Sequence, residues 1–203
     1  MPLLTAAILG CTCFGCFGET TKNGNPKKTR ILYVPLIPKV TDPAYSGEVP
    51  LNMVKLYVEV IDDRDVTNQI GQNLEEEGKP AVKVIADEGD SPTEFVRKMF
   101  NKQLKDIGAP LADKAESADR LLSLKITKFW AEEAPGYHGS VNIAAELKES
   151  GKTVWRGALV GESKRFGRSL STDNYRETLS DATVRAINRL LSEASFRTAI
   201  TKQ

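Results

Sequence analysis

Cysteine is absent from the sequence after residue 16, and histidine occurs once, at His138. A zinc site needs about four nitrogen or sulfur ligands, so we expect no metal and no cofactor in the body of the chain. A catalytic histidine needs a nucleophile or a substrate within hydrogen-bonding reach. The sequence contains no Gly-x-Ser-x-Gly motif and no reactive cysteine to serve it. We therefore interpret His138 as a loop residue without a catalytic role and predict that the protein is not an enzyme.

The chain also lacks an excess of charge and a long apolar run after residue 18. Its 28 basic and 27 acidic side chains leave a formal net charge of +1, which argues against nucleic acid as a partner. A membrane-spanning helix needs about 20 consecutive apolar residues, and no later stretch approaches this length. With 203 residues and 40% hydrophobic content, we predict a single globular domain over residues 31–203.

All three cysteines, Cys11, Cys13 and Cys16, lie near the N-terminus. Residues 1–10, MPLLTAAILG, are uncharged and mostly apolar, with the length of the apolar region of an export signal. The sequence Ile8-Leu9-Gly10-Cys11 then resembles the lipobox of bacterial lipoproteins. This resemblance implies that residues 1–10 are a cleaved signal peptide, and that Cys11 becomes the first residue and carries acyl chains such as palmitate.

Two other interpretations of the cysteines stay open. Cys13 and Cys16 form a C-x-x-C pair, which is typical of redox or metal sites, although a polar segment follows it. The region is also compatible with an unmodified apolar leader, because residues 1–10 lack the Lys or Arg of a standard signal peptide. Under the lipoprotein interpretation, residues 11–30 comprise the anchor cysteine and a flexible polar tether.

The β-strands are predicted from alternating and β-branched runs. We expect strands over residues 31–37, 54–61 and 121–129, and a hairpin of 141–147 with 154–160. A turn at Glu149-Ser150-Gly151-Lys152 joins the two strands of the hairpin. In the strand 121–129, alternation places Leu122, Leu124, Ile126 and Lys128 on one face and Phe129 on the other.

Two helices are predicted. Residues 91–108 begin with Ser91 as N-cap and Pro92 at the first position, Glu94 is placed to complete a capping box, and Gly108 ends the helix. A second helix covers about 174–196. The element order predicts an α+β fold, in which two helices pack on one face of a mainly antiparallel sheet as a two-layer sandwich.

Several stretches of the body resemble the YajG-type family of uncharacterised bacterial lipoproteins. These are VEVIDDRDVTNQIG, ADRLLSLKITKFW, GKTVWRGALVGES and NYRETLSDATVRAINRLLSEASF, between about residues 54 and 196. The resemblance implies a lipid-anchored protein of the cell envelope, on the periplasmic face of the outer membrane. Thr12, after the anchor cysteine, agrees with that location. The family supplies no catalytic residues.

The resemblance leads us to expect a non-enzymatic lipoprotein that binds or scaffolds another envelope protein or a glycan. One alternative is an auxiliary lipoprotein of a transport system that carries an apolar ligand between its helices and its sheet. Such a carrier needs an apolar pocket of about 300 Å³ or more. A less favoured alternative is a periplasmic enzyme.

Aromatic and arginine side chains dominate the binding energy of many interfaces, and one segment after the hairpin is rich in them. We predict partner contacts from Trp155, Lys164, Arg165, Phe166 and Arg168, with core packing as the alternative for Trp155. The last four lie in a predicted basic loop.

The acidic run Asp62-Asp63-Arg64-Asp65 invites comparison with a calcium-binding loop. An EF-hand starting at Asp63 would need glycine at its sixth position and glutamate at its twelfth, where Asn68 and Leu74 stand. This excludes the EF-hand. We therefore expect Arg64 to pair with a neighbouring carboxylate at the end of a strand.

Overall fold

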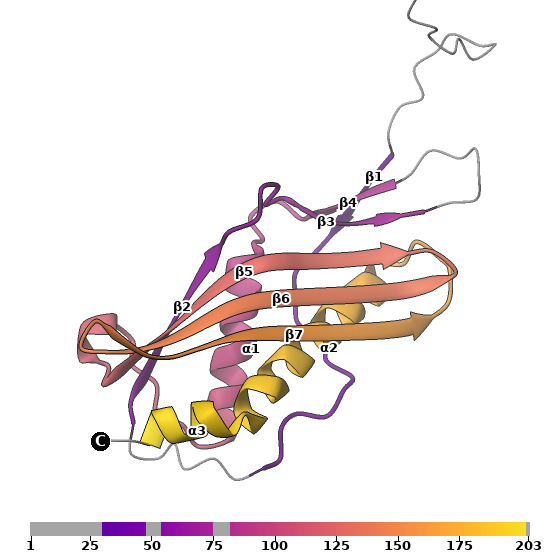
Figure 1. Cartoon of the computed structure of the whole chain (residues 1–203). Coiled ribbons are helices and arrows are strands. Elements are labelled where there is room, and N and C mark those ends of the chain that lie inside the picture. The colour runs from indigo at the N-terminus through magenta and orange to yellow at the C-terminus, as the bar shows by residue number, and fades with distance from the viewer. Residues whose placement is uncertain (1–29, 48–53, 75–81, 202–203) are drawn as a thin grey trace, which may run out of the picture.

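The computed structural model describes residues 30–47, 54–74 and 82–201, which form one sheet and three α-helices (Figure 1). The strands are β1 (Arg30–Val34), β2 (Leu56–Asp62), β3 (Gln69–Asn73), β4 (Val82–Ala86), β5 (Arg120–Glu133), β6 (Gly136–Glu149) and β7 (Lys152–Phe166). The helices are α1 (Pro92–Asp106), α2 (Thr172–Ser192) and α3 (Ala194–Thr201), with a short 3₁₀ turn at Ala115–Ser117.

The sheet is mixed. Its order is β1-β4-β3-β5-β6-β7, and β2 also pairs with β5. The long strands β5, β6 and β7 are antiparallel neighbours, whereas β1–β4, β2–β5 and β3–β5 are parallel pairs. The α+β class is confirmed, and the prediction of a mainly antiparallel sheet is wrong, because β2 and β3 both join the same edge of β5 in parallel.

The helices cover one face of this sheet. Helix α2 contacts β5, β6 and β7 and also touches both α1 and α3, and all three helices contribute to one buried core. Alternate residues of the long strands, such as Leu124, Ile143 and Leu159, are buried in that core, while the residues between them point to the opposite face. We call that opposite face the open face.

Helix α1 begins and ends where its capping residues predict. The Ser91 hydroxyl accepts a hydrogen bond from the Glu94 backbone N–H at 3.2 Å, and Gly108 has a φ of +83°, a conformation that glycine adopts without strain. The Glu94 carboxylate instead pairs with Arg97 at 2.7 Å.

The C-terminal region forms two helices where one was expected over about 174–196. Helix α2 starts after Ser171. It ends at Ser192, and the next residue, Glu193, is extended with a ψ of 118°, while α3 begins at Ala194. The backbone at Glu193 therefore leaves the helical conformation, and the described residues form three α-helices where two were predicted.

The predicted β6–β7 turn is confirmed, with positive φ angles at Ser150 (48°) and Gly151 (78°), as a tight hairpin turn of this kind requires. The first strand is shorter than the predicted 31–37 and ends at Val34, because Pro35 has no N–H to continue a ladder. Strands β3 and β4 were not predicted.

Candidate functional site

A groove lies on the open face, where the loop after β2 meets strands β5, β6 and β7. Its volume is about 720 Å³, within the range of ligand-binding pockets. Its lining comes from five parts of the chain, namely Asp63, Asp65 and Val66 of the loop, Gln69 of β3, Lys128, Trp130 and Glu132 of β5, His138 and Ser140 of β6, and Glu162 and Lys164 of β7. We call this the open-face groove.

Arg64 holds the loop that forms one wall of the groove. Its Nη2 lies 2.7 Å from Asp62 Oδ2, and its Nη1 donates to the carbonyl oxygens of Gln69 and Phe129. The guanidinium carbon also lies 5.8 Å from the centroid of the Phe129 ring, within the range of a cation–π contact. The predicted pairing of Arg64 with a neighbouring carboxylate is confirmed, and these contacts fix the wall.

A β-bulge in β5 decides which side chains reach the groove. The β5–β6 register shifts between Ile126 and Lys128, so the extra residue reverses the alternation that follows. Phe129 is therefore buried and packs edge-on to Phe95 at 5.5 Å. The predicted faces of Lys128 and Phe129 are wrong for this reason, and Trp130, Lys128 and Glu132 were missed as groove residues.

The groove carries charges of both signs. Of its acidic groups, Glu132 accepts a hydrogen bond at Oε2 from Gln72 Nε2 at 2.8 Å. Of its basic groups, neither Lys128 nor Lys164 forms an ion pair within residues 30–47, 54–74 and 82–201. Glu132, His138 and Lys164 are successive cross-strand neighbours. His138 is thus an exposed strand residue, not the loop residue that was expected.

Trp155 lies in the core. The residue is 7% exposed, and its indole packs edge-on to Phe196 at 5.1 Å and donates to the Ser195 hydroxyl at 2.9 Å. The alternative of core packing therefore describes Trp155, and the residue lies away from the partner surface that was predicted.

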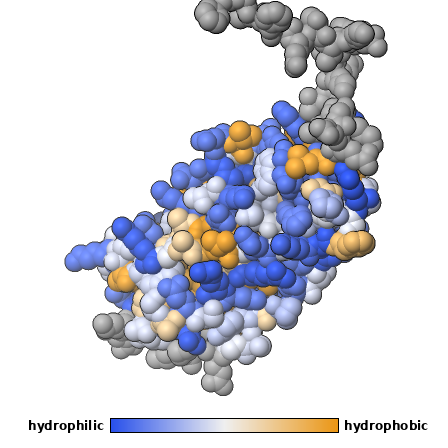
Figure 2. Space-filling model, turned by 45° about the vertical axis from the view of Figure 1, so that its right-hand side comes forward, coloured by the Kyte–Doolittle hydropathy of each residue, from blue (hydrophilic) through white to orange (hydrophobic). Residues whose placement is uncertain are grey.

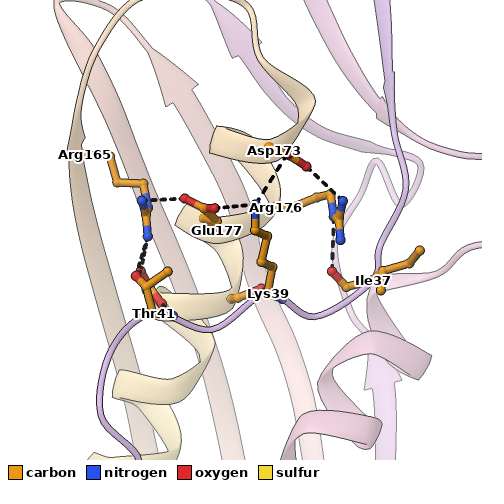
Figure 3. A network of polar contacts seen from close by, with 9 residues as sticks. Ile37, Lys39, Thr41, Arg165, Asp173, Arg176 and Glu177 are labelled. Atoms are coloured by element: carbon orange, nitrogen blue, oxygen red, sulfur yellow. Dashed lines mark hydrogen bonds and ion pairs between the residues drawn. The ribbon is translucent and has the colours of Figure 1, made fainter.

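Arg165 belongs to a polar network that fastens residues 35–47 to α2 (Figure 3). It pairs with Glu177 at 2.5 Å and with Asp181 at 3.0 Å, and it also bonds the Thr41 hydroxyl. Lys39 extends the network to Glu177 at 2.7 Å and Asp173 at 3.4 Å. Arg165 therefore has an internal structural role.

The carboxylate of Asp181 is the best-bonded group of this network. It accepts hydrogen bonds from the Thr41 backbone N–H and hydroxyl and from the Asp42 N–H. Burial would raise the pKa of Asp181, but the bonds from Thr41, Asp42 and Arg165 outweigh burial, and the pKa falls below its ordinary value of 3.8. Asp181 therefore keeps its charge in the fold.

The rest of the predicted basic loop divides into bonded and free side chains. Strand β7 runs through Phe166, so Lys164, Arg165 and Phe166 lie on a strand where a loop was expected. Arg168 donates to the Leu74 carbonyl at 3.0 Å. Phe166 is 100% exposed, and Lys164 reaches the open-face groove. Of the predicted partner residues, Lys164 and Phe166 are the two that are exposed and whose side chains form no hydrogen bond or ion pair with the described residues.

A second buried network stands at the start of α2. Glu133 is fully buried and accepts hydrogen bonds from the N–H groups of Ser169 (2.7 Å) and Leu170 (3.1 Å) and from the Tyr175 hydroxyl (3.2 Å). Burial and the carboxylate of Glu133 raise the pKa of Tyr175, which keeps the phenol protonated as a donor. This network positions the β7–α2 connection.

Cys11, the predicted lipidation site, lies outside the described residues, as do the signal peptide and most of the tether. Among the described residues, no group of three or more His, Cys, Asp or Glu side chains is placed to hold a metal ion. In the same part of the chain, no helix combines the length and the apolar character that a membrane span requires.

Comparison with known proteins shows a shared fold. No protein-family model matches the sequence, and no curated protein matches it. Among solved structures, protein XCC0632 from Xanthomonas campestris, of the family DUF330, is similar with a TM-score of 0.53 and 12% identity, over 79% of this chain and 94% of that chain. At this identity the likeness shows an α+β fold in common.

A second solved structure, described as an uncharacterized protein, has a TM-score of 0.50 and 13% identity over 81% of this chain and 97% of that chain. Lipoprotein GNA1162 from Neisseria meningitidis is similar at a TM-score of 0.34 and 12% identity, over 54% of this chain and 81% of that one. This third likeness is too weak to carry an argument.

Proposed function

We propose that the chain is a non-enzymatic, lipid-anchored bacterial lipoprotein whose body binds or scaffolds another envelope component. The observation that carries the proposal is the lipobox-like Ile8-Leu9-Gly10-Cys11 behind an apolar leader. Two or more acyl chains on Cys11 suffice for stable membrane attachment, because each buried methylene contributes about 0.8 kcal/mol. Resemblance to the YajG-type family, with Thr12 after the anchor, supports the periplasmic face of the outer membrane.

The open-face groove is the surface that we assign to the partner. Trp130, Lys128 and Lys164 line it together with several carboxylates, and aromatic and cationic groups are common anchors of interfaces. Because charged side chains of both signs line the groove beside Trp130, the groove suits an envelope protein or a glycan better than an apolar ligand.

A carrier of apolar ligands is the second candidate, and the core argues against it. The space between the helices and the sheet is occupied by large buried side chains, among them Phe95, Phe100 and Leu124. The groove lies on the other face of the sheet and carries charged side chains. Figure 2 shows a largely hydrophilic surface in which apolar residues form separate small groups.

The residues with shifted pKa values lie away from the groove, which favours binding over catalysis as its function. Perturbed pKa values often mark catalytic groups in clefts. Here the raised pKa of Tyr175 and the lowered pKa of Asp181 belong to residues that fasten α2 and its preceding loop. Their hydrogen bonds have a structural purpose, and neither residue lines the open-face groove.

Replacing Cys11 with Ala tests the anchor. The Cys11→Ala protein should keep its leader and fail to incorporate labelled palmitate, because the thiol that is acylated before cleavage is gone. Cys13→Ala and Cys16→Ala are the matched controls and should be labelled normally. Equal labelling of the Cys11→Ala protein would overturn the anchor at this position.

A further inference from the structure

Strand β7 forms one border of the sheet and leaves a backbone edge unpaired. Among the described strands it pairs with β6 alone. The carbonyl oxygen of Glu162 points away from β6, where it accepts a hydrogen bond from Arg185 Nη1 at 2.7 Å. Because backbone groups alternate along a strand, Ala158 and Val160 aim their N–H and C=O groups the same way. Within the described residues, no hydrogen bond reaches those groups. Such an edge is a template for an added strand.

Two hollows adjoin this edge. One, of about 410 Å³, is lined by Gly157 and Ala158 of β7, by Arg189 and Ser192 of α2, and by Glu193 directly after α2. The other, of about 620 Å³, lies between Val160, the segment of residues 43–46 and α2. Both are lined by Arg189 and Ser192, so they are neighbours between the β7 edge and α2, and we call the two together the trough.

The polar groups of the trough indicate what it would bind. Arg189 lines both hollows, is exposed and forms no ion pair with any residue in the described ranges. Asn188 donates to the Pro43 carbonyl at 3.1 Å, but its own Oδ1 is buried without a partner. A strand in the trough would bring a carboxylate to the exposed Arg189.

We infer that the β7 edge accepts an extended acidic peptide segment of a partner protein as an additional strand. Its backbone would pair with the free groups of Ala158 and Val160, and one of its carboxylates would pair with Arg189. Main-chain bonds give affinity in this mode of recognition, and side-chain contacts give specificity. The site is distinct from the open-face groove and does not depend on the lipid anchor.

A second copy of the chain fits the trough less well than a single peptide strand. The partner copy would approach with its own β7 edge, which is walled by its own α2 and residues 43–46. The two sets of walls would compete for the same space along the shared edge. A peptide brings no such wall, and its acidic side chains complement the unpaired Arg189.

The inference is tested with the purified full chain in detergent micelles and a fluorescent peptide of about eight residues, alternating Thr and Glu. A peptide alternating Thr and Lys is the matched probe. Fluorescence anisotropy should show the acidic peptide binding at least about tenfold more tightly than the basic one, with an affinity that weakens as salt rises.

Two variants separate the backbone contribution from the charge. Ala158→Pro removes the outward N–H while leaving the bonds to β6 in place, and Ala158→Ser keeps that N–H. Arg189→Glu reverses the charge, and Arg189→Lys retains it. Ala158→Pro and Arg189→Glu should each weaken acidic peptide binding about tenfold or more, whereas the two conservative variants should bind within about threefold of the parent chain.

The results also distinguish the other occupants. Unchanged binding by Arg189→Glu, or equal binding of the two peptides, would overturn the inference, and Arg189→Glu serves as the folded test if Ala158→Pro unfolds. The edge would instead belong to a second copy of the chain under two results together. The parent chain would bind no peptide, and sedimentation would show a dimer that the Ala158→Pro variant does not form.

Discussion

Polar side chains on the two sides of the sheet differ in whether they are hydrogen-bonded within the protein. On the helix side, Glu133 and Asp181 are buried and each accepts three or more hydrogen bonds. On the open face, Lys128 and Lys164 have no ion-pair partner in the described chain, and they line a groove. Polar groups that must be buried are bonded for stability, whereas polar groups that face a groove stay available to a partner. The difference separates structural residues from candidate binding residues.

The neighbouring residues Glu133 and Glu132 test this comparison most strongly. Glu133→Ala removes a buried carboxylate that accepts three hydrogen bonds, one of them from the buried Tyr175 hydroxyl, and because a hydrogen bond to a charged group contributes about 1.5–3 kcal/mol, we expect a loss of about 4 kcal/mol in the free energy of unfolding. Glu132→Ala loses one bond from Gln72 on the open face and should cost about 0.5 kcal/mol. Urea denaturation measures both, and equal losses would contradict the comparison.

Asp181 should have the next largest effect. Asp181→Ala leaves the Thr41 N–H without its acceptor and removes one of the two carboxylates that pair with Arg165, and breaking a buried charge pair costs about 3 kcal/mol. Asp173→Ala is the control, because the Asp173 side chain in the same network is 55% exposed and should cost less than about 1 kcal/mol. A loss for Asp181→Ala as small as that for Asp173→Ala would show that the network does not stabilise the fold.

The pH dependence of Asp181 sharpens the same point. Its folded pKa lies below the ordinary value of 3.8, so around and below this pH the unfolded chain binds more protons than the folded one. The stabilisation by Asp181 is therefore fully present above the ordinary pKa and is lost as the pH falls through the folded pKa. The difference in unfolding free energy between the parent chain and Asp181→Asn should shrink over that window. A difference independent of pH would contradict this role.

The contact of α2 with β7 gives a smaller expected effect. A Cβ at Gly161 would lie 1.8 Å from the Ala182 carbonyl oxygen, so Gly161→Ala must push α2 away from the sheet. We expect a loss of about 2 kcal/mol. Val160→Ala, one residue away on the open face, should cost less than about 1 kcal/mol. Thermal unfolding of the two variants measures this difference in stability. A Gly161→Ala protein as stable as the parent chain would show that α2 can shift without cost.

The smallest effect is expected in the groove. Lys128→Ala and Lys164→Ala should change the free energy of unfolding by no more than about 0.5 kcal/mol, because neither side chain has an ion-pair partner among the described residues. Chemical denaturation checks this. A loss above about 2 kcal/mol for either variant would move that lysine into the structural group.

The sequence predicts those parts of the fold that depend on local rules. Helix α1 follows from Ser91 and Gly108, and the β6–β7 hairpin follows from its alternation and from Ser150-Gly151. The strands β3 and β4 are five residues each, and β3 has a single strongly apolar residue, Ile70, so no local pattern marks it. The parallel pairs of β5 depend on contacts between distant segments, which local patterns do not encode.

The candidate site was predictable only in part. Arginine-rich composition drew attention to Lys164 and Arg165, but the carboxylates that bind Arg165 lie on α2, 12 and 16 residues away in the sequence. The groove residue Trp130 depends on the bulge at Thr127, whose only signal is that strict alternation would expose Phe129 and bury Lys128. That conflict between alternation and hydrophobicity could have indicated the bulge.

Site-specific photo-crosslinking in intact cells tests most directly the claim that the open face binds the partner. Benzoylphenylalanine is placed at Thr127, which is exposed at the groove, or at Lys98, which is exposed on α1, in the otherwise unaltered full chain. We predict one discrete crosslinked species from Thr127 and none from Lys98. A discrete crosslink from Lys98 with none from Thr127 would place the partner on the helix side and contradict the account.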